Sequence, residues 1–371
     1  MTRRAVLTAP AVGDPHARVA GLTVLERQLF SLQDAGIEEV TVALPRCDLR
    51  LTPRLEIRVV SSDETDLAVV SASADLTARI GLVTHRSLPT RLVHARYRGD
   101  LEAARLMEGE FVVPATDDAS RERAEMLLLN SLIKPTDGLI SRALNRPVSL
   151  RVTRALLDTA LTPNQMTLVA AGFGFAAVMV VALGGAAWLF PGALLLHVQS
   201  VLDGCDGEIS RLKYIRSRAG EWMDQLFDDF INLGFFAAAG VALYRAGLAW
   251  ALGVTLVGVA LHIVYQVALY TALLTKGGGS GSVTSVRWWG QKDWAADQSA
   301  PAARTRLTMA RDAIEIGTRR DFFCFLWIPT TAVGVGGIAL VWIALIFVVS
   351  GTYTSLCWLL AGGPSPAIRT S

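Results

Sequence analysis

The chain has few charged residues and few cysteines for its length. Only 18% of its 371 residues are Asp, Glu, Lys or Arg, whereas 52% are hydrophobic. The formal net charge of +2 is too small to favour nucleic acid as a partner. The four cysteines, Cys47, Cys205, Cys324 and Cys357, have neither the spacing of a zinc site nor the density of a disulfide scaffold. We therefore expect reduced thiols and no nucleic-acid partner.

An apolar leader is also missing from the start of the sequence. Met1-Thr-Arg-Arg opens a short mixed stretch, so we expect no signal peptide. Residues 1–135 are rich in arginine and acidic residues, whereas the remainder carries apolar runs of ~20 residues, the length of a membrane-spanning helix. Six runs begin near Asn164, Ala186, Glu221, Ala249, Phe322 and Gly337. We therefore predict a soluble, Rossmann-like α/β domain followed by an α-helical bundle of six transmembrane helices in a lipid bilayer.

Basic residues gather on alternate connections between the expected spans. They precede the first span and lie between the second and third and between the fourth and fifth, while the opposite connections carry little more than Arg245. The positive-inside rule then puts both termini and the connection after the second span in the cytoplasm. We expect a multi-pass protein of the inner (cell) membrane whose basic clusters meet lipid headgroups.

Four aspartates lie close together between the second and third apolar runs. Asp203 and Asp206 are three residues apart, and Asp224 and Asp228 are four apart, so each pair lies on one helix face. In an antiparallel pair of helices, both faces can meet at one cavity. A carboxylate at membrane depth is costly unless it is paired or binds a cation. Oxygen ligands of this kind favour Mg²⁺ or Mn²⁺; a solvated polar hairpin with accidental spacing is the alternative.

The segment from Asp203 to Asp228 resembles the signature of the CDP-alcohol phosphotransferase (phosphatidyltransferase) family, D-x2-D-G-x2-A-R-x8-G-x3-D-x3-D. It departs once, at Ser210, where the family usually has alanine. The resemblance implies a membrane enzyme that moves a phosphoalcohol or phosphatidyl group from a CDP-linked donor to an acceptor hydroxyl and releases CMP. Two divalent ions that lie about 3.5–4 Å from each other and share aspartate ligands suit such a transfer.

The resemblance also implies roles for single residues. Four carboxylates look like metal ligands, and the last of them also looks like the catalytic base: Asp203, Asp206, Asp224 and Asp228. The nucleotide pocket is expected at Gly207, Ser210, Arg211 and Gly220, with Asn164 at the Pro-Asn start of the first span. Glu221 lies at the hairpin end and Asp229 on another helix face, so neither is expected to act directly.

The first 135 residues alternate between expected strands and helices, as in an α/β domain. The expected strands are Val40–Leu44, Leu67–Ser71 and Phe111–Val113, and the expected helices are Thr23–Ala35 and Arg121–Ile133. The arrangement resembles that of bifunctional inositol-phosphate cytidylyltransferase and di-myo-inositol-phosphate-phosphate synthase chains. Their junction is similar to Lys134–Gly138, Ser141–Arg142 and Asn145–Arg146 here.

The first domain departs from an active nucleotidyltransferase in one respect. Such an enzyme needs a glycine-rich loop with a basic residue after its first strand to hold phosphates. The segment Leu7–His16 offers one glycine and two prolines instead. We therefore expect a degenerate domain with a structural or regulatory role, in which Asp117 and Asp118 are either metal ligands or part of a solvated loop.

The expected boundaries give four parts. They are the α/β domain at 1–135, an amphipathic juxtamembrane segment at 136–163, the six-helix domain at 164–362 and a cytoplasmic tail at 363–371. In the loop Lys276–Thr318, Trp288, Trp289 and Trp294 are typical of the membrane interface. His197 is expected to be packed in the bundle rather than to bind a metal.

The acceptor and the oligomeric state stay open at this point. An alcohol, an inositol phosphate or another polyol phosphate is compatible with the resemblance, and Arg218, Arg319 and Arg320 are candidates either for an acceptor phosphate or for lipid headgroups. A homodimer through Gly240 and the small residues Ala237–Ala239 is a further hypothesis. An inactive scaffold and a transporter are the alternatives from other classes, although the intact aspartates oppose the first and the lack of a repeat opposes the second.

Overall fold

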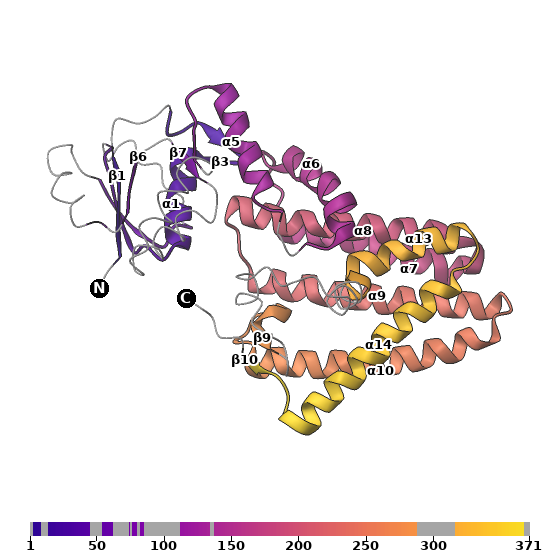
Figure 1. Cartoon of the computed structure of the whole chain (residues 1–371). Helices are drawn as coiled ribbons and strands as arrows, with labels where there is room; N and C mark the ends of the chain where they lie inside the picture. Colours follow the sequence, from indigo (N-terminus) through magenta and orange to yellow (C-terminus); the bar gives the residue numbers. More distant parts are fainter. Residues whose placement is uncertain are drawn as a thin grey trace, which may run out of the picture. The chain divides into compact units, whose positions relative to one another are not determined.

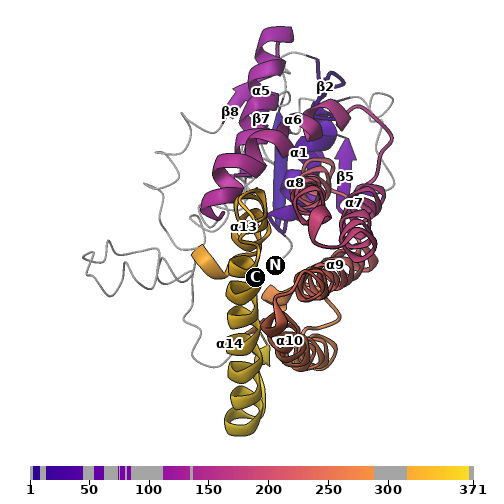
Figure 2. The same cartoon turned by 90° about the vertical axis from the view of Figure 1, so that its right-hand side faces the viewer.

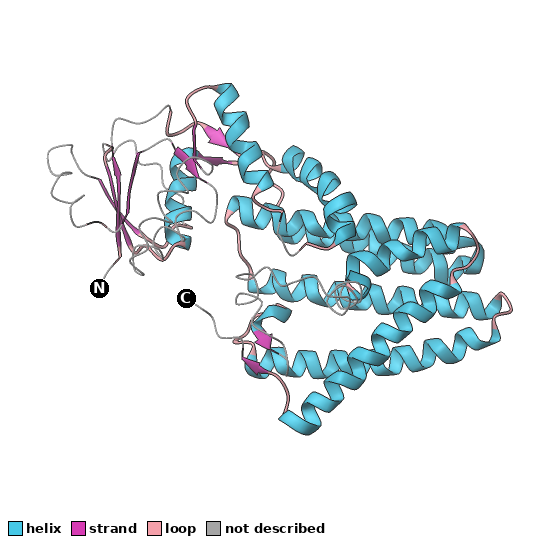
Figure 3. Cartoon of the chain, in the orientation of Figure 1, coloured by secondary structure: helices cyan, strands magenta, loops and turns pink. Residues whose placement is uncertain are grey.

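A computed structural model describes residues 3–8, 14–44, 54–61, 74, 76–79, 82–84, 112–133, 137–287 and 316–366. The chain forms two compact units. The N-terminal unit contains Met1–Pro135 together with Thr153–Ala160 and Arg211–Tyr214. The helical unit contains Thr136–Val152, Leu161–Ser210 and Ile215–Ser371. Figure 3 shows that strands gather in the first unit and that helices dominate the second.

A parallel sheet forms the centre of the N-terminal unit. Its strands are β1 (Arg4–Thr8), β4 (Glu39–Val42), β5 (Arg58–Ser61) and β6 (Leu76–Arg79), in the order β5-β4-β1-β6. Helix α1 (Val24–Asp34) connects β1 to β4, because parallel neighbours need a long crossover. Buried Val6, Leu29 and Val40 pack in one apolar core. The expected strand at Val40–Leu44 and the expected helix at Thr23–Ala35 are thus confirmed, whereas Leu67–Ser71 lies outside the described residues.

Shorter elements complete the N-terminal unit. A hairpin joins β2 (Arg18–Val19) to β3 (Leu22–Thr23), and β7 (Leu82–Thr84) pairs antiparallel with β8 (Val112–Pro114). Strand β8 therefore covers most of the strand expected at Phe111–Val113, although Phe111 itself is not among the described residues. The second expected helix is α5 (Asp118–Asn130), which begins and ends three residues before the expected bounds.

Asp117 and Asp118 mark the start of α5 and not a loop. Asp117 Oδ1 accepts a hydrogen bond from the Ser120 amide at 2.7 Å and caps the helix. The hydrogen bonds from Ser120 hold the pKa of Asp117 below its usual 3.8. Asp118 pairs with Arg121 one turn later. Their carboxylates therefore serve the helix terminus.

Helix α1 carries a buried arginine. Thr23 and Glu26 form a capping box at its start, which fixes the first turn. The guanidinium of Arg27 is 2% exposed and donates to the carbonyls of Val19 at 2.9 Å and Leu212 at 3.1 Å. Phe30, one turn later, stacks on Tyr214 with ring centroids 5.2 Å apart. Residues 211–214 are therefore part of the packing of this unit.

Long helices make up the second unit. They are α7 (Pro163–Gly184), α8 (Leu189–Lys213), α9 (Arg218–Arg245), α10 (Ala249–Lys276) and α14 (Gly337–Ala361), with the shorter α6 (Arg146–Leu156) and α13 (Arg320–Ala332). Short helical turns η2 (Ser141–Asn145), η3 (Gly185–Trp188) and η4 (Val283–Ser285) and the strand pair β9 (Val286–Arg287) and β10 (Ser365–Pro366) complete it. In Figures 1 and 2, α14 runs alongside α10, and α9 packs on both α7 and α10.

Four helical stretches in the described part are long and apolar enough to cross a membrane. They are Pro163–Lys213, which contains α7, η3 and α8, and the stretches Arg218–Arg245, Ala249–Lys276 and Gly337–Leu360. The six expected spans are therefore not confirmed. Helix α13 has 13 residues, or about 20 Å at 1.5 Å per residue, which falls short of a hydrocarbon core of about 30 Å.

Aromatic side chains fill the core of the helical unit. Phe235 packs edge-on against Trp327, and Phe236 against Phe347, with ring centroids 5.4 and 5.0 Å apart. Gly240, which we considered for a dimer interface, faces Thr255 of α10 so closely that a Cβ atom would overlap its hydroxyl. The small residue thus brings α9 and α10 together within one chain.

Candidate active site

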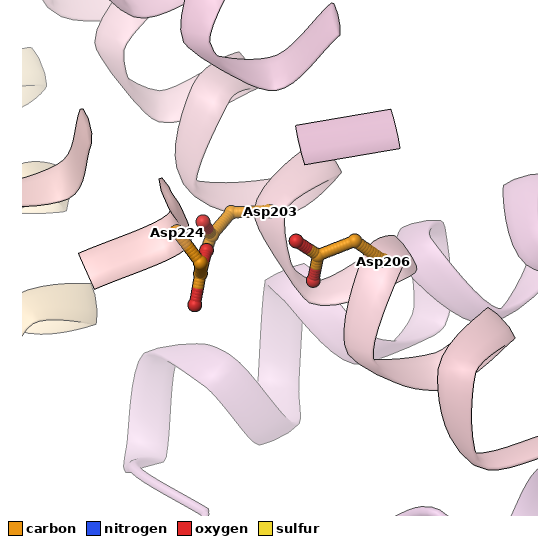
Figure 4. A group of neighbouring side chains, drawn as sticks. All are labelled: Asp203, Asp206 and Asp224. Atoms are coloured by element: carbon orange, nitrogen blue, oxygen red, sulfur yellow. The ribbon is translucent and has the colours of Figure 1, made fainter. Parts of the chain in front are cut away.

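Three of the four motif aspartates come together between α8 and α9. Carboxylate oxygens of Asp203, Asp206 and Asp224 lie within 4.8 Å of one another, and all three side chains are partly buried. Figure 4 shows the first two on one helix and Asp224 on the other, with the three carboxylates close to each other. The spacing of three residues on α8 puts its pair on the face that meets α9.

Asp228 lies outside this group of three and has other partners. Its Oδ1 accepts a hydrogen bond from Gln199 Nε2 at 3.0 Å. Its other oxygen pairs with the guanidinium of Arg320, which also donates to Asp203 Oδ2 at 2.7 Å. Arg320 therefore bridges two motif carboxylates, one from each helix.

A cavity of about 130 Å³ opens beside the aspartates. Asp206 and Asp224 belong to its wall. The four residues of the helical unit expected at the nucleotide all line it: Asn164, Gly207, Ser210 and Gly220. Arg211, the remaining residue expected there, is in the last turn of α8 and belongs to the N-terminal unit.

The start of α7 positions Asn164 at this cavity. Thr162 caps the helix in a capping box with Gln165, and Pro163 occupies the first helical position, where its missing N–H is no loss. One turn on, the Thr167 hydroxyl donates to Asp206 Oδ2. Helix α7 therefore supports a metal-ligand candidate as well as the cavity.

The connection between α8 and α9 forms the floor of the cavity. The Ser210 hydroxyl donates to the Ile215 carbonyl at 2.6 Å, and Ser217 caps α9 by accepting from the Gly220 amide at 3.1 Å. A Cβ atom at Gly220 would overlap Asn164 Oδ1. Glycine is therefore required there by the approach of a neighbouring side chain.

Three residues that sequence reasoning did not assign to the site contribute to it. Thr167 and Gln199 hold motif carboxylates, and Arg216 lines the cavity. A signal for two of them was present, because Thr167 follows Asn164 by three residues and Gln199 precedes Asp203 by four, which are same-face spacings on a helix. Arg320 was expected at a phosphate or a lipid headgroup, and its pairing with Asp203 and Asp228 had no signal in the sequence.

The neighbouring acidic and histidine side chains have separate environments. Asp229 accepts hydrogen bonds from the Tyr270 hydroxyl and from Gln225, on a different face of α9 from the cavity. Glu221 lines the cavity, but its Oε2 also accepts from Ser280 at 2.8 Å. His197 packs edge-on against Phe325, in accord with a packed histidine.

The residues present fit a hard divalent cation. Three carboxylates converge, and Asp224 Oδ1 is buried without a hydrogen-bond partner among the described residues. A buried acceptor without a partner is costly, and a cation would satisfy it. An all-oxygen set of this kind suits Mg²⁺ or Mn²⁺, which retain waters and bind phosphate oxygens.

The chain is similar in sequence to several proteins that share one two-part enzyme name. The chain is 33% identical to the "Bifunctional IPC transferase and DIPP synthase" of Aquifex aeolicus over 37% of this chain and 31% of the relative. For the proteins of the same name from Archaeoglobus fulgidus and Rubrobacter xylanophilus, the identities are 33% and 34%, over 35% and 44% of this chain and 26% and 33% of the relatives. The chain thus spans about a third or less of the length of these relatives.

The family profile covers a larger part of the chain. The profile of CDP-alcohol phosphatidyltransferases matches residues 160–350, which is more than half of the sequence and includes α7, α8, α9 and α13. Together with the converging carboxylates and the adjacent cavity, this match shows that the chain belongs to the CDP-alcohol phosphatidyltransferase family and is a CDP-alcohol phosphotransferase.

Proposed function

We propose that this enzyme transfers a phosphoalcohol or phosphatidyl group from a CDP-alcohol donor to an acceptor hydroxyl and releases CMP, with two Mg²⁺ or Mn²⁺ ions. The observation that supports this most strongly is that Asp206 and Asp224 belong both to the group of three carboxylates and to the cavity wall. A donor diphosphate in the cavity would therefore lie next to the cation site.

Asp203, Asp206 and Asp224 would hold the ions, and Asp228 would complete the set. When bound, such ions neutralise charge on the donor phosphates and hold the reacting groups in line. The small residues Gly207, Ser210 and Gly220 leave room for the nucleotide. Asn164 and Arg216 would contact it with an amide and a positive charge, respectively.

Asp228 is the proposed base that takes the acceptor proton. Gln199 orients its carboxylate from one side. The ion pair with Arg320 must open before Asp228 can accept a proton, because the guanidinium occupies one of its carboxylate oxygens. A carboxylate base of this kind contributes on the order of 10²–10⁴ to the rate.

The acceptor class follows from the relatives only as a proposal. The resemblance of the sequence to bifunctional inositol-phosphate cytidylyltransferase and di-myo-inositol-phosphate-phosphate synthase chains supports an inositol-phosphate-type polar acceptor, which we propose beside a lipid alcohol. The N-terminal unit is proposed to be degenerate, with a structural or regulatory role, and the site is proposed to face the cytoplasm of the inner membrane. A homodimer stays a hypothesis without a residue to support it.

The test is CMP release by the purified full chain in bilayer discs, with Mg²⁺ and either CDP-diacylglycerol or CDP-inositol. A panel of glycerol phosphate, inositol and inositol phosphate serves as acceptors. Asp228→Asn should lower turnover by about 10²–10⁴, whereas Asp229→Asn, the same change one residue later and held by Tyr270, should keep turnover within a few-fold. Equal losses in both variants, or no acceptor-dependent CMP in the wild type, would contradict the proposal.

A further inference from the structure

The juxtamembrane residues that resemble a family junction have no place in the transfer itself, yet several of those that the structure describes have a partner in the helical unit. The described ones with contacts used below are Asp137, Gly138, Ser141, Asn145 and Arg146, and Ser149 follows them. Their contacts lead to two elements of the helical unit, α8 and the N-terminal end of α13. We call residues 137–149 the bracket.

One end of the bracket is fixed to α8 by buried charges. Arg146 donates to Asp137 Oδ2 at 3.0 Å and to Glu208 Oε1 at 2.6 Å. The Ser149 hydroxyl donates to the same Glu208 oxygen at 2.7 Å. The Glu208 side chain is fully buried, so these donors replace the hydrogen bonds to water that its carboxylate loses on burial. Glu208 follows Gly207 in the motif, so this contact holds the motif turn from the side.

A second contact attaches the bracket to α8 just before the aspartate motif begins. Asn145 is buried, and its Nδ2 donates to the Ser200 hydroxyl at 3.3 Å. Ser200 lies next to Gln199, which holds Asp228, and three residues before Asp203. The bracket therefore follows α8 along the stretch that carries the site.

The other end of the bracket reaches α13. The Ser141 amide donates to Asp321 Oδ2 at 2.7 Å. Gly138 faces the same carboxylate, and a Cβ atom there would overlap both of its oxygens. Glycine at 138 thus makes room for Asp321, which lies in the first turn of α13 directly after Arg320.

Because the bracket holds Asp321, it also fixes the backbone of Arg320, the residue before it. Its guanidinium lies between Asp203 and Asp228, at 2.7 Å from Asp203 Oδ2. We propose that the bracket positions Arg320 as a countercharge that competes with a divalent cation at this site. Asp137, Glu208, Arg146 and Asp321 are then positioning residues, and cation binding releases Arg320 and frees Asp228. This inference rests on the cation site of the proposed function.

The test is Mn²⁺ binding to the purified full chain, measured by electron paramagnetic resonance without any substrate. It reports the competition between Arg320 and the cation independently of activity. Arg320→Gln removes the countercharge and should tighten Mn²⁺ binding about tenfold, the effect of one positive charge no longer competing for the same oxygens. Asp321→Ala and Gly138→Ala should each tighten Mn²⁺ binding several-fold, because α13 is no longer held. Gly138→Ala changes no charge, so its effect isolates position from electrostatics.

Non-additivity is the decisive result. In the Arg320→Gln background, Asp321→Ala and Gly138→Ala should change Mn²⁺ affinity less than twofold, since they act through Arg320. Arg319→Gln removes the same charge one residue earlier and should change Mn²⁺ affinity less than twofold. Size-exclusion profiles verify folding. If Asp321→Ala aggregates, the double-mutant cycle is made with Gly138→Ala and Arg320→Gln only.

Two failures are distinguishable. If the wild type binds Mn²⁺ and the bracket variants weaken it equally with or without Arg320, the bracket is merely structural and the inference is wrong. Unchanged affinity in Arg320→Gln overturns the competition itself. If the wild type binds no Mn²⁺ at all, the proposed cation site fails, and the role of the bracket falls with it.

Discussion

At the residue scale, the shape of the cavity depends on how closely two helix starts approach each other. Asn164 in the first turn of α7 points at Gly220 in the first turn of α9, and both line the cavity. The local sequence explains where both residues lie, because Thr162 caps the start of α7 and Ser217 caps the start of α9. The contact between Asn164 and Gly220 shapes the wall of the cavity where the two capped helices meet.

Gly220→Ala should therefore damage donor binding more than chemistry. The added Cβ atom overlaps Asn164 Oδ1, so the amide must move out of the cavity. We expect KM for the CDP-alcohol donor to rise about tenfold, or ~1.4 kcal/mol, while kcat changes little because the aspartates stay in place. Steady-state CMP release against donor concentration measures both constants.

The double variant Gly220→Ala with Asn164→Ala provides the control. Removing the amide relieves the overlap, so the added methyl group should cost nothing further in that background. If Gly220→Ala lowers kcat and leaves KM unchanged, the cavity does not hold the donor as proposed.

At the scale of elements, local sequence signals predict the positions of most of the long helices. Pro-Asn after Thr162 predicts the start of α7, and the apolar runs predict where the long helices lie. The length of α13 was not predictable in the same way, because the apolar sequence continues past Ala332 and the Gly334–Gly337 break alone separates it from α14. Side-chain pairing across elements, such as Arg320 with Asp228, depends on tertiary contacts that no spacing encodes.

Thr162→Ala tests how far the start of α7 supports the site. The change removes the hydroxyl that accepts from the Gln165 amide and breaks the capping box. Loss of such a cap costs about 1 kcal/mol of stability. We expect a lower thermal midpoint of the detergent-solubilised chain and a higher donor KM, because Asn164 lies in the first turn.

Thr162→Ser keeps the cap and serves as the matched control for that variant. It should resemble the wild type in both thermal unfolding and donor KM. A Thr162→Ala variant that loses stability without any change in KM would separate the helix start from the cavity.

At the scale of the whole molecule, the chain combines an α/β unit with a membrane-type helical unit, and the boundary is not a simple cut in the sequence. The N-terminal unit takes in Thr153–Ala160 and Arg211–Tyr214 as well as the first 135 residues. Sequence composition separates the two parts at about residue 135, since charge and hydropathy change there. It cannot reveal that the end of α8 packs with α1, because the buried donor that makes this contact is a single arginine 185 residues earlier.

Arg27→Met should test that role of the N-terminal unit in the intact chain. Methionine fills a similar volume, but it cannot donate to the carbonyls of Val19, Ala20 and Leu212. A buried carbonyl left without a donor costs about 1–3 kcal/mol, so the unit should open more often and be cleaved faster by a protease at low concentration. Arg18→Met, which removes a more exposed arginine that donates to the Gly21 carbonyl at 3.5 Å, is the matched control and should be cleaved at the wild-type rate. Equal cleavage of both variants would mean that Arg27 does not hold residues 211–214. Faster cleavage of Arg27→Met with a parallel fall in CMP release would instead show that the N-terminal unit supports the end of the helix that carries the motif.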